Sequence, residues 1–346
     1  MTALPEAPSA ARRLRRRPWL AWQRSYTAAV LVVVLLVAYV VESDGLSSIA
    51  VLGITNAALP LALVAVAETF VILTNGIDLS VASILTLGNV TLAWFASHGH
   101  ASTGIVLALA IGVGAGLANG LIVNYLRIAP LIATLATMSI FLGVALAIMP
   151  IPLGQVGDTV PYPGWIHSWT AGTIGSVPVA VIWLVVAILA GWLVLRRTAF
   201  GISLQALGGS ESASWGAGIN VGRVRILAYV ASGFCSALAG VVLGGLTESG
   251  DATIGSFYLL EAIAAMVVGG TLLSGGVGTL AGSVLGAVAL TLVFSVLLAY
   301  GVSTNYQYIV TGAIVIGTLL AHSLHSRLGA RAVKRARWAT ADAEGV

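Results

Sequence analysis

Two carboxylates lie unusually close to long apolar runs: Glu68, and Asp78 within the sequence Thr-Asn-Gly-Ile-Asp-Leu-Ser of residues 74–80. A charged side chain near the centre of a bilayer costs about 2.5–3.5 kcal/mol on insertion scales, so it normally faces a cavity or a partner. Gly76 permits a turn, and Asp78 or Ser80 can cap the helix that follows. The segment is therefore a capped helix start near the cytoplasmic face, a broken element that lines a translocation route, or both. Glu68 is either a buried structural contact or a substrate contact.

The sequence holds no pattern typical of an enzyme or a metal site. Lys334 is the only lysine, so the Walker A sequence is absent, and any ATP that drives this protein must be bound by another chain. The five histidines form no H-E-x-x-H pair, and His322 and His325 are better explained as interfacial side chains than as metal ligands. The Gly-x-Ser-x-Gly elbow of hydrolases is absent as well. We expect no catalytic residue, metal or cofactor in this chain.

Composition defines the elements that must position these residues. Of the 346 residues, 58% are hydrophobic and 8% are charged, and the mean hydropathy is +1.01. Soluble domains carry roughly a quarter charged residues, so a soluble enzyme is excluded, and so is a disordered chain. Cys235 is the only cysteine, which excludes a disulfide scaffold. Because a span needs about 20 apolar residues, the sequence predicts an all-α integral membrane protein.

The placement of charge predicts about ten transmembrane helices, with the N- and C-termini cytoplasmic. Basic residues cluster in 12–24, 196–225 and 327–337, and all three clusters fall on one face of this topology. A membrane flank therefore explains the basic runs better than nucleic-acid binding, and a retained first span explains the start better than a secretory signal. The expected spans lie near 24–42, 48–73, 80–97, 104–126, 130–150, 177–195, 226–247, 258–273, 279–300 and 304–322.

This topology divides the chain into three parts. Residues 1–23 form a basic cytoplasmic N-terminal tail, 24–322 the transmembrane domain and 323–346 a cytoplasmic C-terminal tail. Within the domain, residues 196–225 form the longest polar stretch between spans and must be cytoplasmic, because they hold four arginines. Residues 151–176 hold one acidic residue and no basic residue, which suits an outer loop.

Glycine marks helix contacts and a second polar interruption. Gly112, Gly116 and Gly120 fall four residues apart, as do Gly278, Gly282 and Gly286, and each set predicts a smooth helix face for close contact. The interruption at 269–278 joins two apolar runs, as 74–80 does. The two interruptions are weakly similar to each other, which is consistent with the internal repeats found in transporters.

The same segments carry a family resemblance. Residues 68–83 read E-T-F-V-I-L-T-N-G-I-D-L-S-V-A-S, which resembles the signature of ribose/xylose/galactose-type ABC transporter permeases. Further blocks similar to that family follow in the same order from about residue 48 to 322. They lie at 129–135, 198–201, 206–209, 218–221, 261–265 and 269–278. Leu272 and Val277 depart from the family pattern, as do Ser214 and Trp215, which points to a solute other than the usual pentoses or to an unusual ATPase partner.

The resemblance implies a type II-importer-like permease bundle in the bacterial cytoplasmic (inner) membrane. It implies a second permease copy, an ABC ATPase subunit that holds ATP and Mg, and an extracytoplasmic sugar-binding protein. Sequence similarity places the ATPase coupling region between Phe200 and Arg223, where a short helix ending at glycine can seat in an ATPase groove. The coupling residues expected there are Gly201, Gly208, Gly209, Glu211, Ala213, Gly218, Ile219 and Asn220.

We predict the permease subunit of an ATP-driven importer for a monosaccharide such as ribose, xylose or galactose. The alternatives are an ABC permease for a nucleoside or a branched-chain amino acid, and an ion-coupled secondary transporter that uses Glu68 and Asp78. A membrane-embedded enzyme lacks the residues it would need. Polar groups compatible with sugar hydroxyls supply the pathway candidates, which are Glu68, Thr74, Asn75, Asp78, Ser80, Asn119, Asn124, Thr134 and Thr137.

Overall fold

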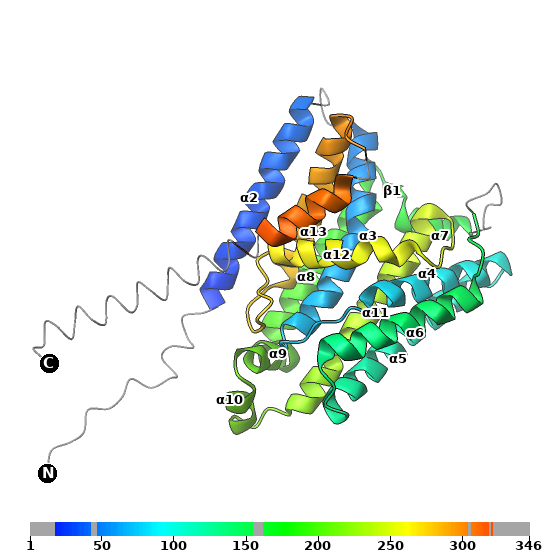
Figure 1. Ribbon diagram of the computed structural model, residues 1–346. Helices are drawn as coiled ribbons and strands as arrows, with labels where there is room; N and C mark the ends of the chain where they lie inside the picture. Colours follow the sequence, from blue (N-terminus) through cyan, green and yellow to red (C-terminus); the bar gives the residue numbers. More distant parts are fainter. Residues whose placement is uncertain (1–17, 43–46, 155–161, 304–305, 318–319, 321–346) are drawn as a thin grey trace, which may run out of the picture.

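The computed structural model describes residues 18–42, 47–154, 162–303, 306–317 and 320 (Figure 1). The predicted C-terminal tail and most of the predicted N-terminal tail lie outside these residues. The first helix begins at Pro18, so the last residues of the predicted N-terminal tail, 18–23, are helical.

The described part of the chain is almost entirely helical, as expected from its composition. A two-stranded antiparallel hairpin, with Ile174 opposite Val177, is the one sheet among the described residues. The elements are α2 (Pro18–Glu42), α3 (Ser48–Ile72), α4 (Val81–Ser97), α5 (Ala101–Tyr125), α6 (Pro130–Ile148), α7 (Gly164–Thr170), β1 (Thr173–Ile174), β2 (Val177–Pro178), α8 (Val179–Arg197), α9 (Ala199–Gly209), α10 (Glu211–Gly216), α11 (Val221–Thr247), the 3-10 helix η1 (Ile254–Phe257), α12 (Tyr258–Val268), α13 (Leu280–Ala299) and a helix over Tyr306–Gly317.

Side-chain caps fix the starts of the helices in the coupling segment. Thr198 accepts a hydrogen bond from Gly201 N at the start of α9, and Ser210 accepts one from Ala213 N at the start of α10. Asn220 accepts from the backbone N of Arg223 at the start of α11. Each cap satisfies a backbone N–H that has no partner inside its helix, so the sequence breaks this segment into two short helices before the long α11.

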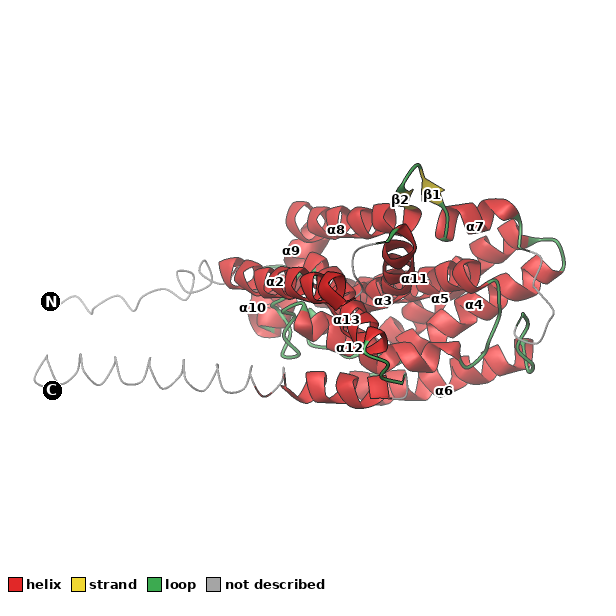
Figure 2. Cartoon of the chain, turned by 90° about the horizontal axis from the view of Figure 1, so that it is seen from above, coloured by secondary structure: helices red, strands yellow, loops and turns green. Residues whose placement is uncertain are grey.

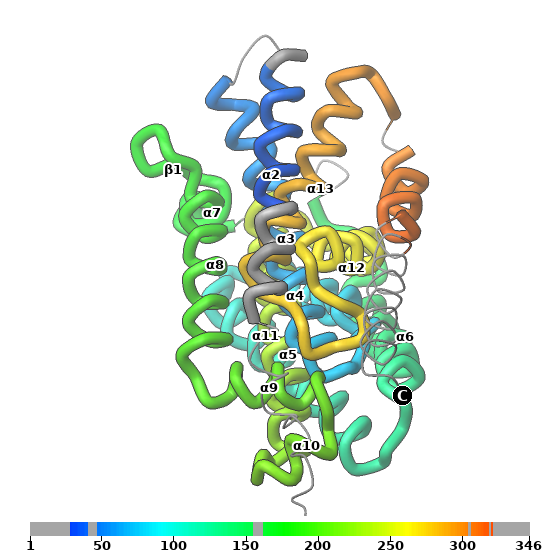
Figure 3. Tube along the Cα trace, turned by 90° about the vertical axis from the view of Figure 1, so that its left-hand side faces the viewer, coloured from blue at the N-terminus to red at the C-terminus, as the bar shows by residue number. Residues whose placement is uncertain are grey.

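Two groups of helices meet at the centre of the molecule. In one group α3 contacts α8, α12 and α13, and α2 packs against α13; in the other α11 contacts α4 and α5, and α6 lies against α4. Figures 2 and 3 show α8 and α6 on opposite flanks, with α3 and α11 between them. The second half of α3 is buried continuously from Ala58 to Ile72, as expected for a helix surrounded by others.

The predicted spans all coincide with apolar helices, although their lengths differ. Within the described part of the chain, six helices are long and apolar enough to cross a membrane: α3, α5, α6, α8, α11 and α13. The apolar part of α2, α4, the η1–α12 segment and the helix Tyr306–Gly317 are shorter, so a count of ten crossings stays a prediction. The span expected at 258–273 ends earlier, at Val268, because the chain turns at Gly270 with a φ of 89°.

The two glycine stripes lie at helix contacts, as predicted. Gly116 faces the backbone of Tyr229 so closely that any side chain would collide with it, and Gly112 faces Gly233 in the same way. Gly286 of α13 likewise faces the backbone of α12 at Ala265. Small residues let the backbones approach closely, which is how helices associate without a hydrophobic driving force.

The connections gather at two ends of the bundle. The hairpin and α7, in the segment expected outside, lie at one end, and α9 and α10 lie at the other (Figures 1 and 3). The opposite placement agrees with the predicted topology, in which residues 151–176 and 196–225 occupy different sides of the membrane. Which end faces the cytoplasm is a prediction from the arginines.

Candidate functional site

The chain turns sharply between α3 and α4, over residues 73–80, which we call the first break. Asn75 adopts a left-handed backbone with a φ of 64°, a conformation that asparagine tolerates better than most residues. The N–H groups of Asn75 and Gly76 donate back to the carbonyls of Ile72 and Val71. These bonds close the end of α3 and direct the chain back into the protein.

Asp78 lies at the centre of a buried polar network. Its Oδ1 accepts hydrogen bonds from the backbone N (3.0 Å) and Oγ (2.6 Å) of Ser80, and its Oδ2 accepts from Oγ of Ser232 on α11 (3.0 Å). The Oε1 of Glu68 accepts from the backbone N of Asp78 at 3.2 Å. All four residues are at most 1% exposed. Protein donors thus saturate Asp78, as a buried carboxylate requires.

Two further predicted residues tie this network to neighbouring helices. Asn119 of α5 donates through Nδ2 to Oγ of Ser80 at 2.7 Å. The hydroxyl of Thr134 on α6 accepts from the backbone N of Leu79 at 3.1 Å, and Thr137 donates to the carbonyl of Thr134 at 3.2 Å. The first break is therefore held by α3, α5, α6 and α11 together.

Ser80 occupies the N-cap position of α4, but its side chain makes no capping bond. Its hydroxyl donates to Asp78 instead. The sequence-based interpretation of a simple capped helix start therefore misses the role of Asp78, whose carboxylate orders the break and reaches across to α11.

Three buried polar atoms around the network have no partner among the described residues: Oε2 of Glu68, Oδ1 of Asn119 and Oη of Tyr229. Buried polar atoms in proteins are nearly always hydrogen-bonded. These three atoms therefore leave the polar network with hydrogen-bonding capacity that the described residues do not use. The described residues contain no group of three or more His, Cys, Asp or Glu side chains that could hold a metal ion.

A cavity of about 950 Å³ opens at the end of the bundle that carries α9 and α10. Thr74 and Asn75 of the first break line it, together with Asn124 at the end of α5. Arg127 and Arg225 add two guanidinium groups to its wall. The predicted pathway residues therefore separate into two sets: Thr74, Asn75 and Asn124 face a cavity, and the others are packed behind it.

The predicted coupling residues border the same cavity. Gly208, Gly209 and Glu211 line it, and Glu211 forms an ion pair with Arg225 at 2.8 Å that joins α10 to α11. The others shape the segment in different ways. Gly201 and Ala213 donate to helix caps, Gly218 takes a φ of 79°, Ile219 packs against the core and Asn220 caps α11.

A glycine contact joins the coupling segment to both chain interruptions. We call residues 269–279, between α12 and α13, the second break. Its Gly276 donates through its backbone N to the carbonyl of Leu73 in the first break at 3.2 Å. A side chain at Gly208, near the end of α9, would collide with that same carbonyl and with Gly276. We refer to Leu73, Asn75, Gly208, Gly275 and Gly276 as the glycine junction.

The junction was not anticipated from the sequence, although a signal for it exists. Glycine pairs occur at the end of α9 and inside the second break, and Gly275 and Gly276 take φ values of 75° and 69°. Pairs of this kind suggest close backbone contact, but no pattern in the sequence says which segments meet.

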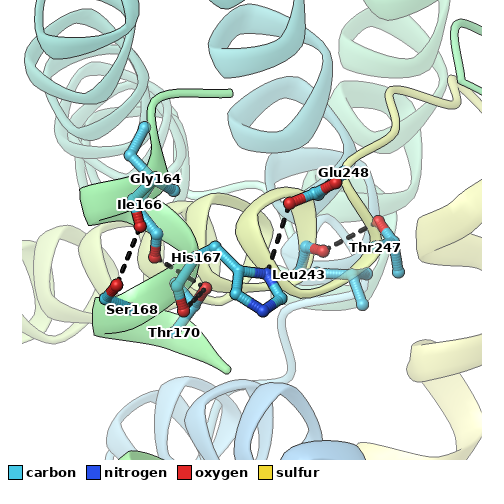
Figure 4. A network of polar contacts seen from close by, with 8 residues as sticks. All are labelled: Gly164, Ile166, His167, Ser168, Thr170, Leu243, Thr247 and Glu248. Carbon is cyan, nitrogen blue, oxygen red and sulfur yellow. Dashed lines mark hydrogen bonds and ion pairs between the residues drawn. The ribbon is translucent and has the colours of Figure 1, made fainter. Parts of the chain in front are cut away.

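The opposite end of the bundle has a polar cluster of its own. Asn89 of α4 donates to the carbonyl of Ser249 at 3.2 Å and accepts from the backbone N of Asp251 at 2.9 Å, which fixes the chain after α11. His167 of α7 contacts Glu248 at 3.3 Å, and both side chains are about half exposed (Figure 4). This end is held by the buried amide of Asn89 and by the half-exposed contact of His167 with Glu248.

Comparison with known proteins places these features in context. Residues 50–319 match the family model described as the branched-chain amino acid transport system permease component. The galactofuranose transporter permease YtfT of Escherichia coli K12 is 35% identical over 266 residues, which cover 74% of this chain and 75% of that protein.

Two ribose import permeases named RbsC are also similar. The Bacillus subtilis protein is 36% identical over 202 residues, which cover 58% of this chain and 62% of the relative. The Haemophilus influenzae protein is 33% identical over 244 residues, which cover 69% of this chain and 74% of the relative. No solved structure matches the chain.

Proposed function

The chain belongs to the family of branched-chain amino acid transport system permease components, and from that premise we propose that it imports a monosaccharide as one subunit of an ATP-driven transporter. It is a multi-pass protein of the bacterial inner membrane, and its family is one of transport subunits. The proposal concerns the solute, the energy source and the residues used.

One observation carries the choice of solute. The Escherichia coli relative that matches three quarters of both chains at 35% identity is named for a sugar, galactofuranose. The family description names branched-chain amino acids, which keeps the amino acid alternative open to test. A monosaccharide such as ribose, xylose or galactose is the solute we propose.

The end of the bundle with α9 and α10 supplies the contact with the energy source. Both helices are short and capped, and Trp215 of α10 is 77% exposed. A short exposed helix can seat in a groove of an ABC ATPase, where ATP and Mg are held. The glycine junction supports this role, because movement of α9 reaches both breaks through backbone contact at Gly208.

The cavity beside the first break is the part of the route that we assign to the cytoplasmic side. Thr74, Asn75 and Asn124 offer neutral hydrogen-bonding groups there, and weak contacts of this kind let a solute leave. Asp78 and Glu68, packed behind the cavity, position the break. A second permease copy and an extracytoplasmic binding protein complete the transporter, and the chain itself carries no cofactor.

A pull-down in mild detergent from the native host tests the assembly. Mass spectrometry should find an ABC ATPase in stoichiometric amount, with an extracytoplasmic binding protein alongside. The purified assembly is then placed in liposomes and given labelled ribose, xylose, galactose, a nucleoside and leucine, with and without ATP.

The expected result is ATP-dependent uptake of one or more sugars. Uptake of leucine or the nucleoside alone would move the chain to another branch of the same family. Sugar uptake that follows an ion gradient without ATP would overturn the proposal in favour of secondary transport.

A further inference from the structure

A second cavity, of about 560 Å³, lies between α2, α3, α12 and α13 at the end of these helices that points away from α10 (Figure 3). Its wall on α3 includes three small residues, Ala50, Gly53 and Ala57, together with Ile54 and Leu61. At Gly53 a Cβ atom would meet nothing within 4 Å. The small residues thus leave open space beside this part of α3.

Glu261 of α12 lies in this cavity, which we call the Glu261 cavity. Its carboxylate makes no hydrogen bond or ion pair with any described residue, and the lining contains no arginine, lysine or histidine. A carboxylate in an apolar helix is costly unless water or a ligand supplies donors, and such residues mark solute pathways. Asp78, by contrast, is saturated by protein donors. The carboxylate of Glu261 is thus available to a ligand.

The other groups around the carboxylate define the class of ligand. Thr291, Ser295 and Gln307 add two hydroxyls and an amide, and Tyr258 and Phe294 add aromatic surface. Hydroxyl and amide groups match the alternating donors and acceptors of a sugar, and aromatic rings cover its apolar C–H face. The volume suits one small ligand and lies within the usual range for such sites.

We propose that the Glu261 cavity binds a neutral polyhydroxylated solute, with Glu261 accepting hydrogen bonds from its hydroxyls. The proposal rests on the proposed function and names a solute contact for it at the end of the bundle opposite the first cavity. It also separates the solute classes. An amino acid also carries a carboxylate, and among the described lining residues there is no arginine, lysine or histidine to pair with it.

Protection of a cysteine tests occupancy directly. In a Cys235→Ala background, Gly53→Cys places a thiol in the cavity, and Gly114→Cys is the matched control, because Gly114 is another helical glycine with open space around it but lies on α5. The whole transporter in detergent is labelled with a thiol reagent, alone or with ribose, galactose or leucine. At a sugar concentration about four times its Kd, mass action predicts roughly fivefold slower labelling of the cavity thiol.

We expect ribose or galactose to protect Gly53→Cys, leucine to protect neither site, and Gly114→Cys to react equally throughout. Adding Glu261→Gln should remove the protection, because the amide replaces the acceptor pair with one acceptor and one donor group. Equal labelling with and without sugar, or protection by leucine alone, would overturn the proposal.

Transport by the same preparations separates this inference from the proposed function. If the unmodified transporter moves sugar with ATP but no sugar protects the cavity thiol, the Glu261 cavity is not the subsite and the function stands. If sugar protects the thiol but no ATP-driven uptake occurs, the subsite stands and the function fails. Gly53→Leu adds bulk to the cavity at a position where a Cβ atom meets nothing within 4 Å, so it should lower sugar uptake more than tenfold, and unchanged uptake would contradict the subsite.

Discussion

The first and second breaks differ in what holds them. The first is ordered by side chains: Asp78 accepts three hydrogen bonds, and Asn119 and Thr134 tie the break to α5 and α6. The second is ordered by backbone, with Gly270, Gly275 and Gly276 in left-handed conformations. The first break is thus a buried network of polar side chains, and the second break is a glycine loop that packs against it.

This difference shows how α9 can act on both breaks. The breaks meet where Gly276 donates to the carbonyl of Leu73, and Gly208 of α9 lies against that contact. A second link lies nearby, where the hydroxyls of Thr69 and Ser283 are 2.7 Å apart between α3 and α13. Because the backbones are packed so closely here, we expect a displacement of α9 to reach both helix pairs.

The largest effect is expected when Asp78, at the centre of the buried polar network, is replaced. Asp78→Ala removes the acceptor of three hydrogen bonds and leaves buried donors without partners, which should destabilise the fold by about 3 kcal/mol or more. Thermal unfolding in detergent, followed by tryptophan fluorescence, measures the loss. Asp78→Asn keeps the shape and two of the acceptor contacts, so it should lose less. Equal stability of Asp78→Ala and the unmodified protein would contradict the role of Asp78 in the polar network.

The second break is tested by a matched pair of glycines. Gly275 and Gly301 have φ values of 75° and 74°, but a side chain at Gly275 would lie 2.9 Å from the backbone N of Asn75, whereas at Gly301 it would meet nothing within 4 Å. Alanine costs about 1–2 kcal/mol of backbone strain at either position. Only Gly275→Ala should also disturb the junction and reduce uptake in liposomes, by about tenfold. Equal losses at the two positions would mean that backbone strain alone matters.

A smaller effect separates two serines one turn apart on α11. Ser232 donates to Asp78, whereas Oγ of Ser236 has no partner among the described residues, and both are fully buried. Ser232→Ala should cost about 1–2 kcal/mol, because the bond goes to a carboxylate. Ser236→Ala should be nearly neutral. Unfolding curves of the two variants measure the difference. A larger loss of stability for Ser236→Ala than for Ser232→Ala would contradict the role of Ser232 in the polar network.

The smallest effect is expected at the far end of the bundle. The His167–Glu248 contact is about half exposed, and exposed ion pairs contribute about 0–1 kcal/mol. His167→Ala should therefore change the unfolding temperature little, and any change should shrink in high salt. A loss as large as that of Ser232→Ala would mean that the two ends are not as different as the contacts indicate.

Sequence patterns predicted much of this architecture. The apolar runs located the long helices. The arginines indicated that the segment with α9 and α10 and the segment with the hairpin lie at opposite ends, and the glycine stripe on α5 indicated a helix contact there. These features are local or periodic, so they can be read from one chain. The length of α12 was overestimated because apolar residues continue past Gly270, where the backbone turns.

Sequence reasoning predicted many residues of the site but not how they contact one another. Glu68, Asp78, Ser80, Asn119 and Thr134 were all selected as pathway groups, and the structure brings them into one buried network. Which of them bind each other depends on contacts between distant segments, such as Asp78 with Ser232. Ser232 was not selected, because a single serine in an apolar helix carries no signal.

The central claim is that Gly208 passes the movement of α9 to both breaks. It is tested by measuring sugar uptake and ATP hydrolysis together in liposomes for Gly208→Ala and Gly209→Ala. A side chain at Gly208 collides with Leu73 and Gly276, whereas one at Gly209 meets nothing within 4 Å. We predict that Gly208→Ala lowers the sugar moved per ATP by about tenfold or more, the effect of a loss of about 1.4 kcal/mol in coupling, and that Gly209→Ala keeps most of it. The same ratio in both variants would contradict the claim.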